Sequence, residues 1–581
     1  MSTYSIHEKR MTTWDGSELF YRAWLPETAY TKAIILFHRG HEHSGRLLGL
    51  AEQLGLEDFA IFAWDARGNG QSPGPRDWAE DFSVYVQDAD CFVRHISTEY
   101  QVPINNMAVI ANSVGGVIAS AWVHDYAPRI RALVLAAPAF RIKLYVPFAV
   151  PLLRIALRLG FMKYVQSYVK SRVLTHDRKE QESFNADPMI SHSIATNILL
   201  DVYDTATRIV KDAKAIRTPT LLLMAGSDWV VKNGVQLRFF RNLGSVTKEI
   251  EYYPNFYHAI FHETGKKEPI RRTKAFILDQ FAETKTPPSL IHADKQGWSK
   301  EEYDLLKIPS ANLLYGLWYK LNRYAMQTLG KLSDGINLGW QEGFDSGVML
   351  DYVYKNAPAG ITPVGKGMDS LYLETAGWAG IRVRKQHMES MLKKWISRLN
   401  KQGKPVHIVD VAAGPGRYVL DAIRKFPDLK ISALLRDYKM VNIEEGRKTA
   451  AQMGITSVSY EQGDAFDRKA LAALAPAPTL AVVSGLFELI PENEPLLHCL
   501  RGLADSMEKD TFLIYTNQPW HPQLEFIARV LTNREGEPWI MRQRTQEEMD
   551  DLVIEAGFEK IEMLIDKWGI FSVSVARKIR K

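Results

Sequence analysis

The sequence predicts a two-domain α/β protein in which each half of the chain forms its own largely parallel sheet. Three observations predict this fold class: two series of short apolar runs that end at turns, a less regular stretch between them, and a different glycine-rich motif in each half. The 581 residues are 46% apolar and 24% charged, as in ordinary globular domains. Because the motifs differ and no sustained repeat is present, we interpret the chain as a fusion and not as a duplication.

The motifs and the less regular stretches divide the chain into four segments. We predict a first domain at residues 1–283 with a cap at about 140–216, a linker at 284–303, a helical extension at 304–400 and a second domain at 401–581. The linker prediction depends on the polar, proline-containing sequence that begins at Thr284.

Charge and cysteine content exclude several classes of protein. The 72 Lys and Arg exceed the 67 Asp and Glu by only five charges, so no nucleic-acid partner is expected. Cys91 and Cys499 alone build neither a disulfide framework nor a cysteine-rich zinc site, and no metal site is predicted. No apolar segment follows Lys9 and Arg10 as it would in a secretory signal, so we expect a cytoplasmic protein.

The first half contains five short apolar runs of the kind that form strands buried on both faces of a parallel sheet. They are Lys32–Phe37, Phe59–Trp64, Met107–Ala111, Ala132–Ala136 and Thr220–Ala225.

A candidate catalytic triad follows three strands of this first sheet. Ser113 lies in Ala111-Asn-Ser-Val-Gly-Gly116, between a strand and a helical sequence, where small neighbours permit the strained turn of a nucleophile elbow. Asp228 and His258 each follow a later strand, which gives the chain order Ser, Asp, His. In this hypothesis His258 takes the proton of Ser113, Asp228 orients the imidazole, and an acyl-enzyme forms and hydrolyses.

Residues 10 to 282 resemble the monoglyceride lipase, lysophospholipase and serine-aminopeptidase-like branch of the α/β-hydrolase fold. The resemblance extends to His38-Arg-Gly-His-Glu-His-Ser-Gly-Arg46, to Asp65-Ala-Arg-Gly-Asn-Gly-Gln-Ser72, and to Leu174-Thr-His-Asp177 with Asp187-Pro188 in the cap. It implies an oxyanion hole made by the backbone amides of Gly40 and Val114. Arg39 and His41 stand where this branch usually has glycines, so the loop departs from the family pattern.

The cap contains an apolar run, Leu144 to Val165, that is interrupted by Arg154, Arg158 and two prolines before it reaches the length of a membrane span. Two interpretations remain open for this run. One is a lipid-facing lid, whose cations reach anionic headgroups while its apolar side chains enter the membrane interface; the other is a buried cap helix. The apolar side chains that would enter the interface are Phe148, Leu152, Leu153 and Phe161. Both interpretations predict an apolar substrate pocket, which favours an ester with an acyl chain.

The second half contains four strand-like runs, which predict another doubly wound sheet. They are Val406–Val411, Lys430–Leu435, Leu480–Ser484 and Phe512–Thr516. The loop Val409-Asp-Val-Ala-Ala-Gly-Pro-Gly-Arg417 follows the first of them, and its small residues let the backbone approach a cofactor closely. Val419 stands where a dinucleotide fingerprint has its third glycine, so NAD is the weaker alternative.

This half resembles the class I S-adenosylmethionine-dependent methyltransferases, which have a Rossmann-like fold. The resemblance rests on Asp410, Gly414 and Gly416 in the first motif, on Asp437 beyond the next strand, and on Asp464 in Gln462-Gly-Asp-Ala-Phe466. It implies S-adenosylmethionine as cofactor, with Asp410 near the methionine part, Asp437 on the ribose hydroxyls and Asp464 at the adenine. The segment Ser484-Gly-Leu-Phe-Glu-Leu-Ile-Pro491 matches the family's fourth-strand region.

The methyl acceptor is not predicted by any single motif. Asn517-Gln-Pro-Trp520 departs from the motif of amino-group methyltransferases at two positions and follows a different strand, so that specificity is not inferred. Trp520, His521, Glu525 and Trp539-Ile-Met-Arg542 are candidate pocket residues, although aromatic side chains beside prolines are more often packing residues.

The whole chain resembles bacterial proteins that fuse an α/β-hydrolase to a class I methyltransferase. We therefore hypothesise a bifunctional enzyme that hydrolyses a lipid-like ester and methylates a related small molecule, with peripheral contact at the inner membrane face through the cap. Two alternatives remain: an inactive hydrolase that serves as an acyl-chain-binding module for the methyltransferase, and a methyltransferase half that senses the cofactor and regulates the hydrolase.

Overall fold

The computed structural model describes residues 4–282 and 287–579 of the chain. The chain divides into two compact units, Met1–Pro287 and Pro288–Lys581. Each unit has its own sheet and its own hydrophobic core, as the two series of strand-like runs predict.

The first unit is built on an eight-stranded sheet that contains all five predicted strands. The strands β2, β4 and β1 pair antiparallel at one edge, and the remaining pairs are parallel. In spatial order the strands are β1 (Tyr4–Thr12), β2 (Glu18–Pro26), β4 (Phe59–Trp64), β3 (Lys32–Phe37), β5 (Met107–Asn112), β6 (Ala132–Ala136), β9 (Thr220–Ala225) and β10 (Lys248–Tyr253).

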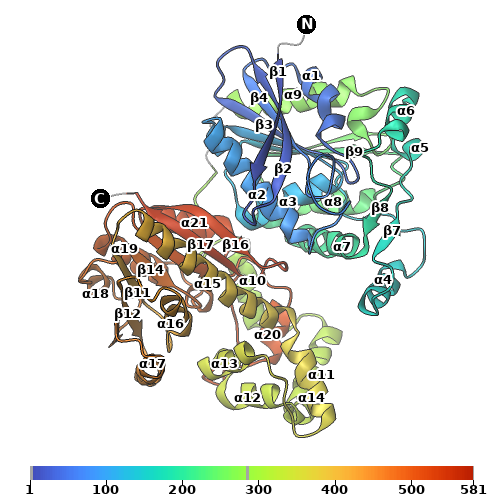
Figure 1. Ribbon diagram of the computed structural model, residues 1–581. Helices are drawn as coiled ribbons and strands as arrows, with labels where there is room; N and C mark the ends of the chain where they lie inside the picture. Colours follow the sequence, from blue (N-terminus) through green and yellow to red (C-terminus); the bar gives the residue numbers. More distant parts are fainter. Residues whose placement is uncertain (1–3, 283–286, 580–581) are drawn as a thin grey trace. The chain divides into compact units, whose positions relative to one another are not determined.

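Helices cover both faces of this sheet (Figure 1). Helices α1 (Leu48–Leu54) and α9 (Lys267–Ala282) contribute to one core cluster with alternate residues of the strands. On the opposite face, Phe92 of α2 (Phe82–Glu99) stacks on Trp64, and α3 (Val114–Tyr126) packs beside α2. Helix α8 (Asn233–Asn242) follows β9. The sheet therefore lies between two helical layers, with its carboxyl-terminal edge free to carry a site.

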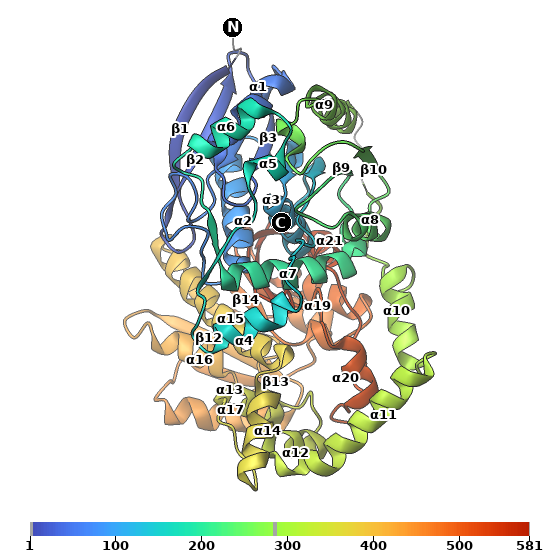
Figure 2. The same ribbon diagram turned by 90° about the vertical axis from the view of Figure 1, so that its right-hand side faces the viewer.

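The cap is inserted between β6 and β9, where the sequence predicts it. Its elements are α4 (Ala149–Arg158), β7 (Tyr164–Gln166), α5 (Ser171–Leu174), α6 (Arg178–Ala186), β8 (Ser193–Ala195) and α7 (Thr196–Lys211). Helix α4 lies against α7 (Figure 2), but none of its own residues is buried. Phe148, Leu152 and Phe161 are 80%, 56% and 65% exposed, and Leu153 is partly buried. This exposure does not agree with a buried cap helix.

No helix within residues 4–282 or 287–579 has both the length and the apolar character needed to cross a membrane.

The second unit is built on a seven-stranded sheet with one antiparallel strand near its edge. In spatial order the strands are β13 (Val458–Gln462), β12 (Ile431–Asp437), β11 (Val406–Asp410), β14 (Leu480–Val483), β15 (Phe512–Asn517), β17 (Ser572–Lys578) and β16 (Phe558–Ile565). The first five are parallel, whereas β17 runs antiparallel between β15 and β16. The chain reverses its direction of winding at β11, so that β11 and β14 flank the point where doubly wound sheets bind ligands.

Two helical layers also enclose this second sheet. Helices α15 (Ala376–Lys401) and α16 (Arg417–Arg424) pack on one face, and α19 (Glu494–Ser506) and α21 (Gln546–Glu555) pack on the other. Helices α17 (Met440–Gln452) and α18 (Arg468–Ala472) complete the layers.

The predicted extension at residues 304–400 is helical. It contains the last four residues of α10 (Trp298–Lys307), then α11 (Leu313–Thr328), α12 (Asp334–Glu342), α13 (Gly347–Lys355), α14 (Pro363–Leu373) and almost all of α15. Helices α12 to α14 gather at the amino-terminal end of α15 (Figure 1) and share a core with α20 (Leu524–Val530). This core is separate from the clusters on the two faces of the sheet.

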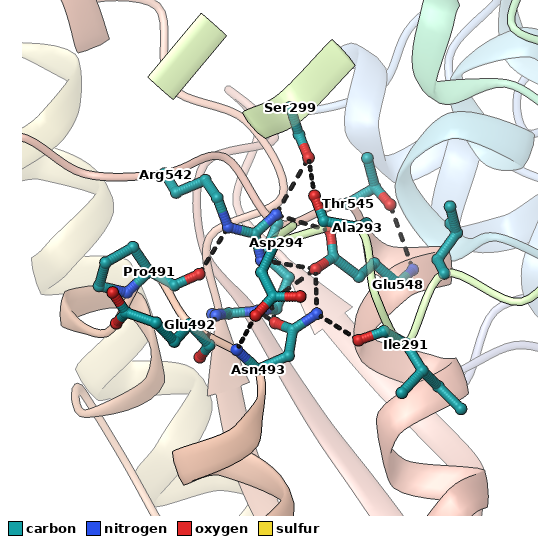
Figure 3. A network of polar contacts seen from close by, with 12 residues as sticks. Ile291, Ala293, Asp294, Ser299, Pro491, Glu492, Asn493, Arg542, Thr545 and Glu548 are labelled. Atoms are coloured by element: carbon teal, nitrogen blue, oxygen red, sulfur yellow. Dashed lines mark hydrogen bonds and ion pairs between the residues drawn. The ribbon is translucent and has the colours of Figure 1, made fainter. Parts of the chain in front are cut away.

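The segment predicted as a linker, 284–303, differs from that prediction in its described part; residues 284–286 lie outside the described residues. From Ile291 the chain is anchored to the second unit by buried hydrogen bonds (Figure 3). The carboxylate of Asp294 accepts the backbone N–H of Asn493 at 2.9 Å, and the amide Nδ2 of Asn493 donates to the carbonyl of Ile291 at 3.0 Å. The sequence predicted a linker here, and the prediction did not include this buried anchoring of Asp294.

A buried ion pair is the centre of this network (Figure 3). Arg542 donates to both carboxylate oxygens of Glu548, to Oδ1 of Asn493 at 2.9 Å and to Oγ of Ser299 at 3.0 Å. Both charged side chains are only 1% exposed. A buried charge is tolerated only when it is paired and hydrogen-bonded. Because Asp294 and Ser299 take part in this network, the segment that contains them is a structural part of the second unit.

Candidate active sites

Ser113 lies at a strained turn between β5 and α3. Its φ of +51° and ψ of −113° are unfavourable for any residue except glycine, and such strain is typical of a nucleophile elbow. The turn requires small residues next to it: a Cβ on Gly115 would lie 2.4 Å from the carbonyl oxygen of His38, and one on Gly116 would lie 2.9 Å from Cβ of Pro138. These contacts explain why the glycines follow Ser113.

The structure brings Ser113, His258 and Asp228 together in one chain of hydrogen bonds. Nε2 of His258 lies 2.8 Å from Oγ of Ser113, and Nδ1 lies 2.8 Å from Oδ2 of Asp228. Oδ1 of Asp228 accepts the backbone N–H groups of Val230 and Val231. All three predicted triad residues are buried. This is the arrangement in which a carboxylate orients an imidazole toward a hydroxyl.

The electrostatics of Asp228 agree with this arrangement. Burial acts to raise its pKa, but the charge of His258, its hydrogen bond and the two backbone donors outweigh burial and hold the pKa below the ordinary value. Asp228 is therefore an acceptor at neutral pH.

The two predicted oxyanion residues are in contact across the site. Val114 is the first residue of α3, and the first N–H groups of a helix have no acceptor within the helix. A Cβ on Gly40 would lie 3.0 Å from Cγ2 of Val114, so the two backbones approach closely beside Ser113. Both residues line the same cavity as Ser113 and His258.

The departures at Arg39 and His41 are accommodated by buried acidic partners. Nε of Arg39 donates to Glu42 at 3.0 Å, and Nδ1 of His41 lies 2.7 Å from Oδ2 of Asp77. Burial of Glu42 acts to raise its pKa, but the charge of Arg39 prevails and lowers it to about 2. His41 adopts a φ of +69°, the left-handed conformation that a glycine would adopt without strain. His41 thus keeps a backbone conformation that favours glycine, and the loop makes two pairs with buried carboxylates, Arg39–Glu42 and His41–Asp77.

A contact that sequence analysis did not predict joins this loop to the cap. Nε2 of His43 lies 2.9 Å from Oδ2 of Asp187, which precedes Pro188 in the cap. Asp65 supports the same loop, because its Oδ1 accepts the backbone N–H of Ser44 at 2.6 Å. His43 and Asp187 are 144 residues apart in the chain, and Ser44 and Asp65 are 21 residues apart. The sequence motifs contain these residues but do not indicate that they are in contact.

The cavity above Ser113 has a volume of about 120 Å³ and an apolar lining from both the sheet edge and the cap. The cap contributes Leu144, Val165, Leu199 and their neighbours, as both interpretations of the cap predict. An apolar cavity next to a nucleophile suits an acyl chain.

In the second unit, the glycine-rich loop joins β11 to α16. Gly414 and Gly416 have φ values of +56° and +77°. A Cβ on Gly416 would lie 2.3 Å from Cδ1 of Leu435, whereas one on Gly414 would meet no atom within 4 Å. Gly416 is therefore needed for packing against β12, and Gly414 faces open space beside the loop.

Asp437 connects this loop to the end of β12. Its Oδ2 accepts the backbone N–H of Gly414 at 2.9 Å, and its Oδ1 accepts Nδ2 of Asn442 at 2.9 Å and the N–H of Lys439 at 2.8 Å. The loop after β13 lies next to it, because the N–H of Gly463 donates to the carbonyl of Asp437.

Asp410 is the last residue of β11, and Asp464 lies just after β13. Asp464 accepts the N–H of Phe466 at 2.9 Å. Asp410 is fully buried and accepts the hydroxyl of Tyr418 and the N–H of Ala412. Burial raises the pKa of Asp410 to about 7, although both hydrogen bonds oppose this change. The predicted cofactor residues thus lie along the carboxyl ends of three neighbouring strands.

A second cavity, of about 400 Å³, lies between the helices of the extension and the loops after β14 and β15. The lining includes three of the candidate pocket residues, His521, Trp539 and Met541. The other candidates do not line the cavity: Trp520 is buried elsewhere, Glu525 is exposed, and Arg542 belongs to the network of Figure 3. Arg384 and Glu488 also line it and form a buried ion pair at 3.3 Å.

Comparison with known proteins divides the chain in a similar way. Residues 273–578 match the family model described as putative methyltransferase, and residues 28–265 match the one described as serine aminopeptidase, S33. Over 575 residues the chain is 47% identical to the protein YnbC of Escherichia coli (strain K12), and this match covers 98% of both chains. The chain belongs to the YnbC family.

The hydrolase part of this YnbC-family protein also resembles enzymes of lipid hydrolysis. It is 27% identical over 255 residues to monoglyceride lipase of Rattus norvegicus, covering 43% of this chain and 82% of that one. It is 25% identical over 265 residues to monoacylglycerol lipase of Mycolicibacterium smegmatis, covering 45% and 94%. The predicted fusion of an α/β-hydrolase with a Rossmann-like methyltransferase is confirmed.

Proposed function

We propose that the first unit is a serine hydrolase of lipid-like esters, of the monoacylglycerol or lysophospholipid type. The observation that supports this most directly is the hydrogen-bonded chain from Ser113 through His258 to Asp228, with both distances at 2.8 Å, at the base of an apolar cavity. The similarity to monoglyceride and monoacylglycerol lipases supports the choice of ester.

The geometry supports acyl transfer through a covalent intermediate. His258 takes the proton of Ser113 as Oγ attacks the ester carbonyl, and Asp228 holds the Nδ1–H tautomer and stabilises the imidazolium. The amides of Gly40 and Val114 stabilise the oxyanion, a contribution of about 3 kcal/mol per donor. His258 returns the proton to the leaving alcohol, and water then releases the acid by the reverse sequence.

Helix α4 supports peripheral contact with a lipid surface. Leu152 within the helix is exposed, as are Phe148 just before it and Phe161 just after it, and Arg154 and Arg158 are also on the exposed surface. Arg154 pairs with Asp204 at 2.5 Å, but exposed ion pairs are worth at most about 1 kcal/mol, so an anionic headgroup can replace Asp204. An ester in the membrane would then lie close to the lid.

We also propose that the second unit transfers a methyl group from S-adenosylmethionine. The residues fit this donor: Gly414 leaves open space above the loop, and Asp437 and Asp464 have lone pairs beyond those used by their backbone donors. Asp437 would hold the ribose hydroxyls, Asp464 the adenine amine, and Asp410 the methionine end. When bound, the donor supplies an electrophilic methyl group; the protein's contribution is to orient it and exclude water.

A fluorophosphonate probe tests the hydrolase directly. We expect the full chain to be labelled, and Ser113→Ala to remain unlabelled while it keeps the thermal unfolding midpoint of the wild type. Absence of labelling in folded wild type would favour the alternative that the first unit only binds acyl chains. Isothermal titration with S-adenosylmethionine tests the second unit, with Asp437→Ala as the variant that should lose binding.

A further inference from the structure

The larger cavity contains a buried carboxylate oxygen that has no hydrogen-bond partner. Glu488 lies in the short 3₁₀ helix Phe487–Leu489 after β14 and is 6% exposed. Its Oε1 accepts Nη1 of Arg384 at 3.3 Å, whereas its Oε2 has no partner among the residues that the structure describes. Leaving a buried acceptor unsatisfied costs free energy, so such atoms in functional proteins are candidates for ligand contacts.

A second unsatisfied atom lines the same cavity. Nε1 of Trp539 is buried and has no hydrogen-bond acceptor within residues 4–282 and 287–579. The ring of Trp539 stacks on that of Trp378, with 6.3 Å between their centroids. The cavity therefore presents a free acceptor on Glu488 and a free donor on Trp539, from two different elements. The buried hydroxyl of Tyr372, which also lines the cavity, likewise has no hydrogen-bond partner among the described residues. A hydroxyl group satisfies both kinds of atom, and an amine satisfies the acceptor.

Most of the remaining lining surface is apolar, although Asp345, Thr375, Gln518, His521 and Gln523 also line the cavity. Phe344, Tyr372, Trp378 and Phe571 contribute aromatic surface, with Ile336, Leu350 and Ile381 beside them. Met326, Met368 and Leu371 contribute side chains from α11 and α14, and Leu371 is 76% exposed, so the apolar lining reaches the molecular surface. A cavity of about 400 Å³ with this composition suits a molecule with an apolar body and one polar end.

Glu488 lies close to the predicted methyl-donor loop. Gly485, which lines the cavity, is the second residue after β14, and β14 pairs in parallel with β11, whose last residue is Asp410. A Cβ on Gly485 would lie 3.3 Å from Nη2 of Arg384, the partner of Glu488. The free carboxylate oxygen thus belongs to the carboxyl-terminal edge of the sheet, where doubly wound folds place their ligands.

We propose that this cavity binds the methyl acceptor, an amphiphile that presents an O–H or N–H group to Glu488 and buries an apolar body among the aromatic side chains. The inference rests on the proposed methyltransferase function and names the acceptor class. As the acceptor oxygen or nitrogen bonds the methyl carbon, the carbon–sulfur bond breaks and its electron pair remains on sulfur. The acceptor's proton passes to Oε2 of Glu488, which acts as general base.

A pair of probes with the same apolar body tests the contact with Glu488. In 4-octylphenol the hydroxyl is free, and in 4-octylanisole it is blocked by a methyl group. We expect the full-length protein, saturated with S-adenosylmethionine, to bind the phenol at least about tenfold more tightly than the ether in isothermal titration, because a hydrogen bond to a charged group is lost. Glu488→Gln should remove most of this preference and leave binding of the ether unchanged.

The matched control is Glu494→Gln, which changes an exposed glutamate in the same region. Both probes can also enter the cavity of the first unit, but the variants share that unit, so differences between them report on the second. Equal binding of phenol and ether to the wild type, or an unchanged preference in Glu488→Gln, would overturn the proposal. The binding ratio decides the acceptor class whether or not the phenol is methylated.

Transfer of a tritiated methyl group to 4-octylphenol tests the role as base. We expect Glu488→Gln to lower the rate at neutral pH about 100-fold or more, with recovery as the pH approaches about 10, where the phenol ionises without a base. Affinity for S-adenosylmethionine should stay within about twofold, since Glu488 is assigned to the acceptor. A Gln variant with an unchanged rate and pH profile would remove the base role.

Two further measurements separate the sources of failure. If the wild type does not bind S-adenosylmethionine, the proposed function has failed; if it binds the donor but does not distinguish the probes, only the acceptor assignment has failed. Should Glu488→Gln not fold, Trp539→Phe tests the same cavity, because it removes the free donor and keeps an aromatic side chain. We expect both probes to bind this variant more weakly, and undiminished binding would contradict the cavity assignment.

Discussion

Replacing Asp228 by Asn would separate the shape of the hydrolase triad from its charge. Oδ1 of Asp228 accepts the N–H groups of Val230 and Val231 at 2.7 and 2.9 Å, and Oδ2 faces Nδ1 of His258 at 2.8 Å. In Asp228→Asn the carbonyl oxygen must face the two backbone donors, because an NH₂ group there would meet two N–H groups. The NH₂ group therefore faces His258.

This orientation forces the wrong tautomer on His258. Nδ1 becomes an acceptor, so the ring proton moves to Nε2, which then cannot take the proton of Ser113 across their 2.8 Å contact. The same change in another serine hydrolase lowers kcat about 10⁴-fold. At about 1.36 kcal/mol per factor of ten, this is a loss of about 5.4 kcal/mol of transition-state stabilisation.

The assay is the steady-state hydrolysis of p-nitrophenyl butyrate by wild type, Asp228→Asn and Asp204→Asn. Asp204 is exposed and pairs with Arg154 on the cap, so its variant controls for the loss of one carboxylate. Thermal unfolding of each variant reports whether the fold is kept. A loss of kcat/KM smaller than about tenfold in folded Asp228→Asn would refute the argument, because the backbone donors would then not determine the orientation of the Asn side chain.

Four other perturbations test the remaining assignments. Gly414→Ala should lower the free energy of unfolding by only about 1 kcal/mol, because the residue is left-handed but the added Cβ meets no other atom. The same variant should abolish binding of S-adenosylmethionine in calorimetry. Retained binding would place the donor elsewhere. Burial raises the pKa of Asp410 to about 7, above the unfolded value of about 4. The protonated carboxyl therefore adds to the free energy of unfolding fully below pH about 4, and this contribution is lost as the pH rises through about 7. Urea unfolding of the second unit should show this decline in wild type and not in Asp410→Asn. Glu548→Gln should lower the free energy of unfolding by about 3–5 kcal/mol, since it leaves a buried arginine charge uncompensated, and a loss below about 1 kcal/mol would mean that water reaches the pair. Replacing Arg154 and Arg158 by Glu should reduce sedimentation with anionic liposomes, whereas unchanged sedimentation would return α4 to a role in cap packing.

Strands that are buried on both faces could be predicted from the sequence. Every residue of β4, β5 and β9 is buried, so each appears as an uninterrupted apolar run. Strands β1 and β13 were not predicted, because most of their residues are exposed or only partly buried and neither strand shows an apolar run. They are held by pairing with a neighbouring strand, which the local sequence does not reveal.

The two sites differ in how much of each the sequence could predict. Ser113, Asp228 and His258 were predictable because each follows a strand, and the carboxyl ends of parallel strands converge at one edge. The second cavity was predicted only in part: His521 and Trp539 were candidates, but most of its lining comes from helices and loops between Met326 and Phe571 whose packing no local pattern indicates. The linker prediction at 284–303 relied on prolines and polar residues, and this composition does not distinguish a solvated segment from one whose polar groups are paired in the interior.

The anchoring of Asp294 and Ser299 determines where the second unit can be separated from the first. Expression of the methyltransferase part from residue 304, where the sequence places its helical extension, would delete Asp294 and Ser299 together with most of α10. Asn493 and Arg542 would then each lose a partner inside the protein. A gene fragment intended to fold independently should therefore begin at Pro288, because a fragment that starts after Ser299 would leave Asn493 and Arg542 each with one buried hydrogen-bond partner fewer.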